Sequence, residues 1–440
     1  MVITHTLDTM APVEPPNSTA ATRFSVLHVS SSDAVGGSGY AAYRLHRGLQ
    51  RSGWTSRMLV GRTLRRDADV TTVSAGRPMW LADRAWGRIA DWLGYPEVYV
   101  PSSVGLSRHP WVRQADVVQV YNVHGGYLSL PALRAVARVR PVVWRLSDMW
   151  AATGHCGYSY DCERWRSGCG ACPLLSEPPA LRRDTTAALW AFKRRVYRGM
   201  SVTLVTPSQW LADIARTSPL LAGWPVRVIP TGVDTDVFHP MPQSAARARL
   251  GLPIDGRVIL CGAAEAAAPR KGVEAFRRAM EVGQGERMPW TVAIVGAGRR
   301  EPDTVAYAGV RWLGALTEES QMAAAYAAAD VFVLPTRADN LPNMLLESLA
   351  CGTPVVTGAV GGCPEAIQHG ETGYLAPAGD VHALVQGIRF ILEDAARRQA
   401  MSRQCRAVAE RDYTLARQVR DFAALYREVI AMAPGLRHAD

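Results

Sequence analysis

The sequence predicts an α/β protein with two doubly wound domains, each a parallel sheet covered by helices on both faces. Short apolar runs rich in β-branched residues recur along the chain, and stretches with helical periodicity separate several of them. Alternation of this kind is typical of parallel sheets, because a helix must carry the chain back before the next strand begins. The 440 residues, 48% of them hydrophobic, are enough to bury two ordinary cores.

Each half of the chain is expected to contribute one sheet. Six strands are expected in the first half, at residues 24–29, 56–60, 117–121, 142–146, 202–206 and 226–230. Six more are expected in the second half, at residues 258–262, 291–295, 310–313, 331–334, 353–357 and 374–376. After about residue 384 the pattern is helical and charged to the end of the sequence.

Prolines and a polar, alanine-rich stretch separate the two sets of strands just after residue 240. They predict a linker and so fix the expected domain boundaries. The expected parts are a floppy tail at 1–22, a first domain at 23–240, a linker at 241–256, a second domain at 257–412 and a final helical segment at 413–440.

The excess positive charge lies entirely in the first half of the chain. Residues 1–240 contain 27 Lys and Arg against 17 Asp and Glu, whereas residues 241–440 contain 22 of each kind. A basic domain can meet nucleic acid, an anionic lipid surface or a phosphorylated molecule. The cations are dispersed and no nucleic-acid-binding motif accompanies them, so we expect no nucleic acid partner and favour a membrane face or a lipid-diphosphate acceptor.

The chain shows neither the pattern of a signal peptide nor that of a membrane span. Residues 1–22 are polar and contain prolines, and no run of about 18 apolar residues occurs. We therefore expect a cytoplasmic protein, with peripheral contact at the inner membrane face left open. The helical pattern at residues 82–94 sets Trp86, Ile89 and Leu93 on one side. Such a helix can rest on a membrane or simply pack on its own domain.

Two carboxylates, Asp339 and Glu347, lie around the start of a short helix that is expected between two buried strands. The first amides of this helix are those of Asn343, Met344 and Leu345. They would point out of the carboxyl edge of the sheet, where a helix N-terminus attracts phosphate. Glu347 lies one turn further on, where it could accept hydrogen bonds from ribose hydroxyls. These residues predict a sugar-nucleotide site, and the alternative is that the acids only cap and solvate the helix.

At these positions the chain resembles the retaining glycosyltransferases of family 4, which have the GT-B fold. The family signature is a Glu, seven further residues, a second Glu and then a run similar to Ala-Cys-Gly-Thr-Pro-Val-Val. Here Asp339 takes the first position, Glu347 takes the second, and residues 350–356 read ACGTPVV. The resemblance implies two Rossmann-like domains facing a cleft, an acceptor bound by the first domain and a nucleotide sugar bound by the second. It also implies that the final helix packs back on the first domain.

Arg270 and Lys271 precede Gly272 and the start of a helical pattern. Two cations at a helix start are unfavourable because they oppose the helix dipole. Their presence therefore suggests a function, such as neutralising the charge of a leaving diphosphate. Lys271 is one of only two lysines among the 49 basic residues. The chain resembles family 4 here, although residues 263–265 lack a further Arg that the family usually has. Because the pair could do the work that a divalent metal does in other enzymes, we expect no cofactor for catalysis, and a solvated pair at a helix start is the alternative.

Three glycine-containing turns follow predicted strands. Gly36 and Gly37, in SSSDAVGGSGY, let the backbone approach a ligand at the start of a helix and are similar to the Gly-Gly loop of family 4. Gly296 and Gly298 end another strand and would allow a nucleotide base close to the backbone. The third turn contains Gly361, Gly362 and Glu365, which are similar to family 4 and can equally be structural.

Half of the eight cysteines lie in one glycine-rich segment, with His155 beside them. They are Cys156, Cys162, Cys169 and Cys172. In a cytosolic chain, a C-x2-C pair with two more cysteines nearby indicates a structural zinc site more often than a disulfide. The first pair is spaced more widely than in an ordinary zinc knuckle, so four free thiols that pack the loop are the alternative.

The same segment is similar to a branch of family 4 in which a strand ends in His-Asp-Met-Trp before a Cys-rich loop. This chain has Ser147 in place of the His, followed by Asp148. The resemblance gives that His a contact with the donor sugar, which here passes to Ser147, Asp148 or His124, a residue that follows another strand in YNVHGGY. His124 and Asp148 are therefore candidate catalytic residues, although a His at a strand end is often only a packing residue.

Together these observations predict a retaining glycosyltransferase that moves a sugar from a nucleotide diphosphate to a hydroxyl of a polysaccharide or lipid-linked oligosaccharide. Arg270 and Lys271 would hold the diphosphate, Glu347 the ribose and Asp339 the sugar. The sequence shows no obvious nucleophile, which favours attack by the acceptor on the front face. The alternatives are transfer to an antibiotic-like aminocyclitol, a sugar-nucleotide epimerase and a non-catalytic sugar-nucleotide sensor.

Overall fold

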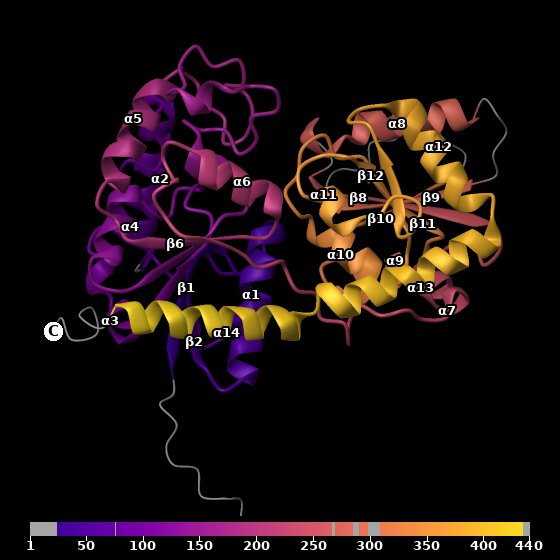
Figure 1. Ribbon diagram of the computed structural model, residues 1–440, viewed down its shortest axis with the longest axis horizontal. Coiled ribbons are helices and arrows are strands. Elements are labelled where there is room, and N and C mark those ends of the chain that lie inside the picture. Colours follow the sequence, from indigo (N-terminus) through magenta and orange to yellow (C-terminus); the bar gives the residue numbers. More distant parts are fainter. Residues whose placement is uncertain (1–23, 75, 266–268, 285–289, 298–308, 434–440) are drawn as a thin grey trace, which may run out of the picture.

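The computed structural model describes residues 24–74, 76–265, 269–284, 290–297 and 309–433. The expected tail at residues 1–22 and the predicted turn residue Gly298 lie outside them. The described residues form two lobes side by side, each with a parallel sheet between helices (Figure 1). This is the two-domain α/β fold that the sequence predicts.

The first sheet has seven parallel strands in the order β3-β2-β1-β4-β5-β6-β7. The strands are β1 (Ser25–Ser32), β2 (Thr55–Arg62), β3 (Val70–Thr72), β4 (Val117–Val120), β5 (Val142–Arg145), β6 (Val202–Thr206) and β7 (Val226–Val228). The helices of this lobe are α1 (Gly36–Arg51), α2 (Gly76–Leu93), α3 (Pro110–Gln114), α4 (Leu130–Ala137), α5 (Thr186–Tyr197) and α6 (Gln209–Thr217). Short 3-10 turns are η1 (Pro101–Ser103), η2 (Leu106–Arg108), η3 (Trp150–Ala152) and η4 (Arg164–Arg166).

The second sheet has six parallel strands in the order β10-β9-β8-β11-β12-β13. The strands are β8 (Arg257–Glu265), β9 (Trp290–Ala297), β10 (Val310–Gly314), β11 (Val331–Leu334), β12 (Val355–Gly358) and β13 (Gly373–Ala376). The helices of this half of the chain are α7 (Gln243–Leu250), η5 (Pro269–Lys271), α8 (Val273–Gln284), α9 (Glu319–Ala328), α10 (Asn343–Ala350), α11 (Cys363–Ala366), α12 (Val381–Leu392), α13 (Ala395–Asp412) and α14 (Leu415–Met432), of which α14 lies on the first lobe.

All twelve strands expected from the sequence are present, with ends that differ by a few residues. Strand β3 was not predicted, because three residues reading Val-Thr-Thr are too few and too polar to give a strand pattern. It forms at the edge of the first sheet, where it pairs with β2. Tertiary pairing, and not local sequence, therefore makes this strand.

The strand order of each sheet reverses at its centre, between β1 and β4 in the first sheet and between β8 and β11 in the second. Loops that leave neighbouring strands in opposite directions open a crevice at the carboxyl edge, and ligands of open α/β sheets bind there. The glycine-rich segment follows β1, and the helix with Glu347 follows β11. The fold therefore puts both predicted motifs at the two crevices.

Helix α14 leaves the second lobe and lies along the first (Figure 1). Its apolar side chains pack into a core with α1 and β1, in which Phe422 and Tyr426 are buried. Tyr426 also donates a hydrogen bond from its hydroxyl to Gln119 Oε1 at 2.5 Å. Burial of several apolar side chains, each stabilising by about 1.5–3 kcal/mol, fixes the last helix to the first lobe.

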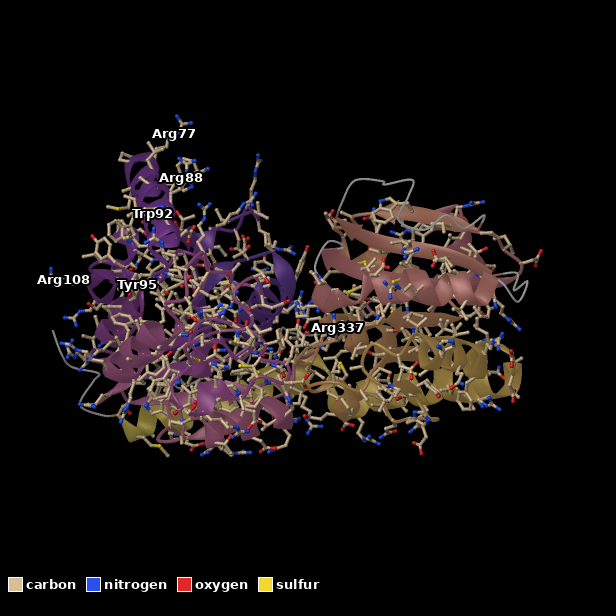
Figure 2. The ribbon with its side chains drawn as sticks, turned by 90° about the horizontal axis from the view of Figure 1, so that it is seen from above. Arg77, Arg88, Trp92, Tyr95, Arg108 and Arg337 are labelled. Carbon is tan, nitrogen blue, oxygen red and sulfur yellow. The ribbon has the colours of Figure 1, made fainter. Side chains whose placement is uncertain are left out.

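Helix α2 differs from its neighbours because Ala90 is the only buried residue among its 18. It projects from the first lobe, with Arg77, Arg88 and Trp92 along it (Figure 2). Large apolar side chains are exposed on it, including Leu81 at 59% and Trp92 at 54%. No helix among the described residues is long and apolar enough to cross a lipid bilayer.

Candidate functional site

The carboxyl edges of the two sheets face each other, and loops from both sides touch across the gap. Asn343 Nδ2, at the start of α10, donates to the carbonyl oxygen of Gly37 at 3.0 Å. The Glu365 carboxylate accepts hydrogen bonds from the amides of Gln209 and Trp210 at 2.7 and 2.8 Å, at the positive end of α6. The residues predicted separately on the two domains therefore line one cleft.

Arg270 and Lys271 meet Asp339 on the second domain's side of this cleft. The two cations lie in η5 after β8, and Asp339 lies in the loop between β11 and α10. Lys271 Nζ is 2.5 Å from Asp339 Oδ2, and Arg270 Nη1 is 3.1 Å from the same oxygen. The sequence predicts all three residues for the site, but it does not predict that they form one cluster.

The Asp339 cluster keeps an excess of positive charge. Asp339 is buried, which alone would raise the pKa of its carboxyl, but the charges of Lys271 and Arg270 outweigh burial and hold that pKa below its ordinary value. The Tyr158 hydroxyl donates to Asp339 Oδ1 at 3.4 Å, and the Arg270 guanidinium lies 4.8 Å from the centre of the Tyr158 ring. Two cations and one carboxylate leave a net charge of about +1, which suits an anionic ligand.

Glu347 lies one turn into α10 and is held by residues of both domains. Its Oε1 accepts a hydrogen bond from Arg44 Nη2 at 2.7 Å, and its Oε2 accepts one from the Tyr326 hydroxyl at 3.1 Å. Arg44 Nε also donates to Glu319 Oε1 at 2.8 Å. Burial alone would lower the pKa of Arg44, but the two carboxylates raise it above its ordinary value. Arg44 thus ties α1 of the first domain to α9 and α10 of the second.

A cavity of about 300 Å³ opens between α1 and α10. Six predicted donor-binding residues line it, namely Gly36, Gly37, Gly296, Asn343, Met344 and Glu347. A volume of this size is typical of a site for a nucleoside-sized molecule. The structure therefore brings these six residues, which come from both domains, to one place.

Leu345 is the one predicted donor-binding residue that does not line this cavity. Its side chain is fully buried, and its amide donates to the carbonyl oxygen of Pro342 at 3.1 Å. Helix α10 begins at Asn343, and Pro342 is its N-cap residue. The Leu345 amide thus has a partner within its own turn, and its predicted contact with phosphate stays a prediction.

The glycine-rich segment after β1 begins a helix and is not a free loop. Helix α1 starts at Gly36, which has a φ of +64°, and Gly37 and Gly39 lie in the first turn. A Cβ on Gly39 would lie 3.1 Å from the carbonyl oxygen of Ser32, so glycine allows the helix to start close to the strand. The sequence predicts that the helix, with its positive N-terminal end, begins after the glycines. In the structure the glycines themselves form that N-terminal end.

Gly361 and Gly362 support the Asp339 loop from behind. Gly361 has a φ of +55°, and a Cβ on it would overlap the carbonyl oxygen of Asp339. The Gly362 amide donates to the carbonyl oxygen of Asn340 at 2.7 Å. The turn therefore positions the loop that carries Asp339.

The variant Gly361→Ala is expected to move Asp339 and to lower turnover of a nucleotide sugar by about 10²-fold, because displacements near 1 Å have effects of that size. Nucleotide release measures the effect. Gly256→Ala is the matched control, since Gly256 has a φ of +86° and nothing within 4 Å of its added Cβ. Equal losses in the two variants would contradict the proposed support of Asp339.

His124 and Asp148 form an ion pair on the first domain's side of the cleft. His124 Nε2 lies 3.0 Å from Asp148 Oδ2, and Asp148 Oδ1 accepts the Trp150 amide at 2.9 Å. Burial alone would lower the pKa of His124, but Asp148 raises it above its ordinary value. Burial alone would raise the pKa of Asp148, but His124 holds it below its ordinary value. Ser147, the third candidate at this place, accepts Asn340 Nδ2 on its carbonyl oxygen at 3.1 Å.

The His124–Asp148 pair is expected to stabilise the protein in a limited pH range. The raised pKa of His124 gives a contribution that is complete below about pH 6.5 and is lost as the pH rises through that raised pKa. The lowered pKa of Asp148 gives a second contribution to stability, which is complete above about pH 4 and is lost as the pH falls through that lowered pKa. Thermal unfolding of Asp148→Asn should therefore show a deficit of roughly 2 kcal/mol near about pH 6 and less at alkaline pH. A deficit that does not depend on pH would contradict this.

The four predicted zinc-binding cysteines and His155 line one small cavity in the loop after β5. All eight cysteines of the chain are free thiols. Cys172 Sγ lies 3.4 Å from His155 Nε2, and burial raises the pKa of Cys156 to about 12. Among the described residues, no three side chains of His, Cys, Asp or Glu are arranged to hold one metal ion. The structural zinc site therefore stays a prediction.

Metal analysis of the purified protein tests the zinc prediction. We expect about one zinc ion per chain, because four thiols and an imidazole gather in one loop. The double variant Cys169→Ser/Cys172→Ser should lose the metal and unfold at a lower temperature. A native protein without zinc would leave the cysteines as packed free thiols.

Sequence reasoning missed several residues that contact the predicted ones. Arg44, Tyr158 and Tyr326 contact Glu347 or Asp339 directly, and Glu319 contacts Arg44. One signal for Arg44 exists, because it stands beside Ala41 and Leu45 on the apolar side of its helix, where an arginine needs a buried partner. The other three residues carry no such signal, because their partners lie far away in the sequence.

Two family models match this chain. Residues 256–394 match the model described as Glycosyl transferases group 1, and residues 35–237 match the model described as Glycosyltransferase Family 4. The first match contains the Asp339 and Glu347 motif, and the second contains the glycine-rich start of α1 and the His124 loop. The two matches therefore cover both sides of the cleft.

Relatives with curated functions match parts of the chain. The D-inositol 3-phosphate glycosyltransferase of Thermobispora bispora is 34% identical over 193 residues, which are 40% of this chain and 44% of that protein. The GDP-mannose-dependent monoacylated alpha-(1-6)-phosphatidylinositol monomannoside mannosyltransferase of Corynebacterium glutamicum is 34% identical over 201 residues, 42% of this chain and 52% of that protein. The chain thus spans about half the length of these relatives.

Solved structures resemble the chain over most of its length. The crystal structure of Anabaena HepE in complex with UDP-glucose has a TM-score of 0.63 and 17% sequence identity, and the match covers 92% of this chain and 100% of that one. At this identity the likeness shows the two-domain GT-B fold alone. On the two sides of one cleft, the chain therefore contains a Glycosyltransferase Family 4 domain and a Glycosyl transferases group 1 domain.

Proposed function

We propose that this protein is a retaining glycosyltransferase that transfers a sugar from a nucleotide diphosphate to a hydroxyl of a polysaccharide or lipid-linked oligosaccharide. The observation that carries the proposal is the cluster of Arg270, Lys271 and Asp339 at the carboxyl edge of the second sheet. It lies in the same cleft as the Gly37 turn, which Asn343 joins across the gap.

The residues of the cleft divide the work of binding the donor. Glu347 accepts hydrogen bonds from the ribose, and the start of α10 at Asn343 faces the diphosphate. Arg270 and Lys271 turn from Asp339 to the diphosphate as it takes the negative charge of the leaving group. Asp339 then accepts hydrogen bonds from the donor sugar. Charge stabilisation of the leaving diphosphate supplies the main part of the acceleration.

The resemblance to family 4 suggests retention, and the lack of a free nucleophile among the described side chains near the sugar favours front-face attack over a covalent sugar-enzyme step. Asp339 is tied to two cations, and its lowered pKa makes its carboxylate a weak nucleophile. The acceptor hydroxyl therefore attacks from the face that the diphosphate leaves. Its oxygen bonds to the anomeric carbon, the bond from that carbon to the phosphate oxygen breaks, and the proton goes to the departing diphosphate. Because the two cations neutralise this charge, we propose that no divalent metal is required.

The relatives suggest which donors and acceptors to try first. The mannosyltransferase of Corynebacterium glutamicum has GDP-mannose and a phosphatidylinositol monomannoside in its name, and the HepE structure contains UDP-glucose. These supply candidate donors and a lipid-linked candidate acceptor for this chain.

The surface of the first domain supports work at a membrane. Helix α2 exposes Leu81 and Trp92 beside Arg77 and Arg88, a combination that suits an anionic lipid surface (Figure 2). We propose a cytoplasmic enzyme that contacts the inner membrane face through this helix. Sedimentation with phosphatidylglycerol vesicles, but not with phosphatidylcholine vesicles, and its loss in Trp92→Asp, would support that contact. No sedimentation with either vesicle would refute it.

Product analysis tests the proposed function. The full chain is incubated with UDP-, GDP- or dTDP-sugars and with an oligosaccharide, a lipid-linked oligosaccharide or an aminocyclitol, with and without EDTA. We expect a glycoside of unchanged anomeric configuration by proton NMR, formed equally well with EDTA. Inverted configuration would refute retention, and an epimerised nucleotide sugar without a glycoside would favour the epimerase.

A further inference from the structure

We propose that the cavity between α2, Glu97 and the loop after β4 binds the acceptor ring, and that it selects a ring with hydroxyl or ammonium groups and without phosphate. The proposal rests on the proposed function and names the acceptor class. The cavity measures about 330 Å³, which is large enough for a sugar or cyclitol ring. It is separate from the donor cavity, since none of its lining residues is shared with it.

The charge of this cavity is opposite to that of the domain around it. Three acidic side chains line it, those of Asp83, Asp91 and Glu97, and the one described basic side chain of the lining is His124, which is paired with Asp148. Residues 1–240 as a whole have ten more basic than acidic residues. An anionic ring would meet like charges at short distance in this cavity, whereas hydroxyl and ammonium groups would find acceptors.

Glu97 has a free acceptor atom. The residue is 6% exposed, its Oε1 accepts the Gly125 amide at 3.1 Å, and its Oε2 is buried without a hydrogen-bond partner. Its backbone has a φ of +57°, a conformation that is costly for a residue with a side chain. A strained residue with an unpaired carboxylate oxygen is typical of a binding site, because a ligand can supply the missing donor.

Trp86 adds a free donor and an apolar wall. Its Nε1 is buried without a partner, and its ring packs edge-on against Tyr99, with 5.2 Å between the ring centres. Both rings line the cavity. A cavity with an aromatic wall, beside one buried unpaired donor and one buried unpaired acceptor, has the features expected for a ring with polar edges and apolar faces.

The cavity lies beside the reaction centre, and His124 joins the two. His124 lines the cavity, and its Nε2 is 3.0 Å from Asp148. Arg270, which contacts Asp339, is among the charges that lower the pKa of Asp148. If a ring binds in this cavity, a hydroxyl that extends past His124 would therefore lie next to the proposed position of the donor sugar.

A structural role for Glu97 is the competing explanation. On its inner side Glu97 also lines a much smaller cavity with Lys193, where a water molecule could bond to Oε2. Lys193 Nζ already donates to the carbonyl oxygens of Trp150 and Thr153, at 2.6 and 2.9 Å, and burial lowers its pKa to about 7. A structural Glu97 would affect thermal stability and all substrates alike, whereas a binding Glu97 would affect the acceptor alone.

The experiment compares one ring in three forms, using the donor that the native chain consumes. The probes are methyl glucoside, the methyl glycoside of glucosamine and methyl glucoside 6-phosphate. We expect kcat/KM at least tenfold higher for the first two than for the phosphate. A higher value for the amine identifies ammonium recognition, and equal values identify hydroxyl recognition. A preference for the phosphate, or equal use of all three, would overturn the proposal.

Variants distinguish binding from structure. Glu97→Gln is expected to raise the acceptor KM at least tenfold and to change the donor KM less than twofold. If Glu97→Gln does not fold, the same two KM values are measured for Trp86→Phe. Glu163→Gln, an exposed acid in the same domain, is the control. Equal changes in both KM values would overturn the proposal. If no donor is consumed at all, the proposed function itself fails, whereas intact donor hydrolysis without discrimination between the rings overturns only this inference.

Discussion

Lys271→Ala is expected to lower the turnover number for a nucleotide sugar by about 10²–10³-fold, the loss typical of removing one group that stabilises a developing negative charge. Lys271 Nζ lies 2.5 Å from Asp339 in the cleft and has a side chain that is 17% exposed, so water substitutes poorly for it. The charge it neutralises appears only as the diphosphate leaves, so the donor KM should change less than kcat. Steady-state nucleotide release measures both.

Arg278→Ala is the matched control for Lys271. Arg278 lies on the following helix α8, is 63% exposed and pairs only with Glu274 among the described residues, so its loss should leave kcat unchanged. Lys271→Arg should recover part of the activity, because it restores the charge. A kcat for Lys271→Ala within threefold of the native value would refute the assigned role.

Arg44→Met is expected to destabilise the protein by about 3–5 kcal/mol, because it leaves buried Glu347 without its cation. Arg44 is 7% exposed and pairs with Glu347 at 2.7 Å and Glu319 at 2.8 Å across the two domains. Differential scanning calorimetry should therefore show a lower unfolding temperature. The donor should also bind more weakly, since Arg44 holds Glu347 beside the donor cavity.

A double-mutant cycle separates the ion pair from other effects of Arg44. If the unpaired carboxylate causes the loss, Arg44→Met/Glu347→Gln should be more stable than Arg44→Met alone. Arg47→Met is the control on the same helix, because Arg47 is 46% exposed and its ion-pair partner, Asp67 at 3.6 Å, belongs to its own domain. Additive losses in the double variant would refute the interdomain ion pair as the cause.

The fold could be predicted from the sequence because the patterns that indicate strands and helices are local. Each strand of a doubly wound sheet is a short apolar run, and the runs at residues 331–334 and 202–206 match β11 and β6 residue for residue. Strand β3 was missed because it depends on pairing with β2. The start of α1 was placed too late, because glycines read as a turn when only their local preference is considered.

The sequence predicted most residues of the candidate site but not their partners. Asp339 and Lys271 each follow a strand, which places both at the carboxyl edge, but only the strand order of the sheet puts β8 next to β11. Arg44 could not be paired with Glu347 from the sequence, because that contact depends on how the two domains meet. The partner of the Leu345 amide could not be predicted, because the exact start of α10 decides which amides bond within the first turn.

Donor turnover by the native chain and by Glu347→Ala shows whether the cleft between the two domains is a nucleotide-sugar site. UDP-, GDP- and dTDP-sugars are each incubated with both proteins, and nucleotide release is followed. We expect slow hydrolysis of one donor by the native chain and its loss in Glu347→Ala. No binding or turnover of any donor by the native chain, or equal turnover by the variant, would contradict it.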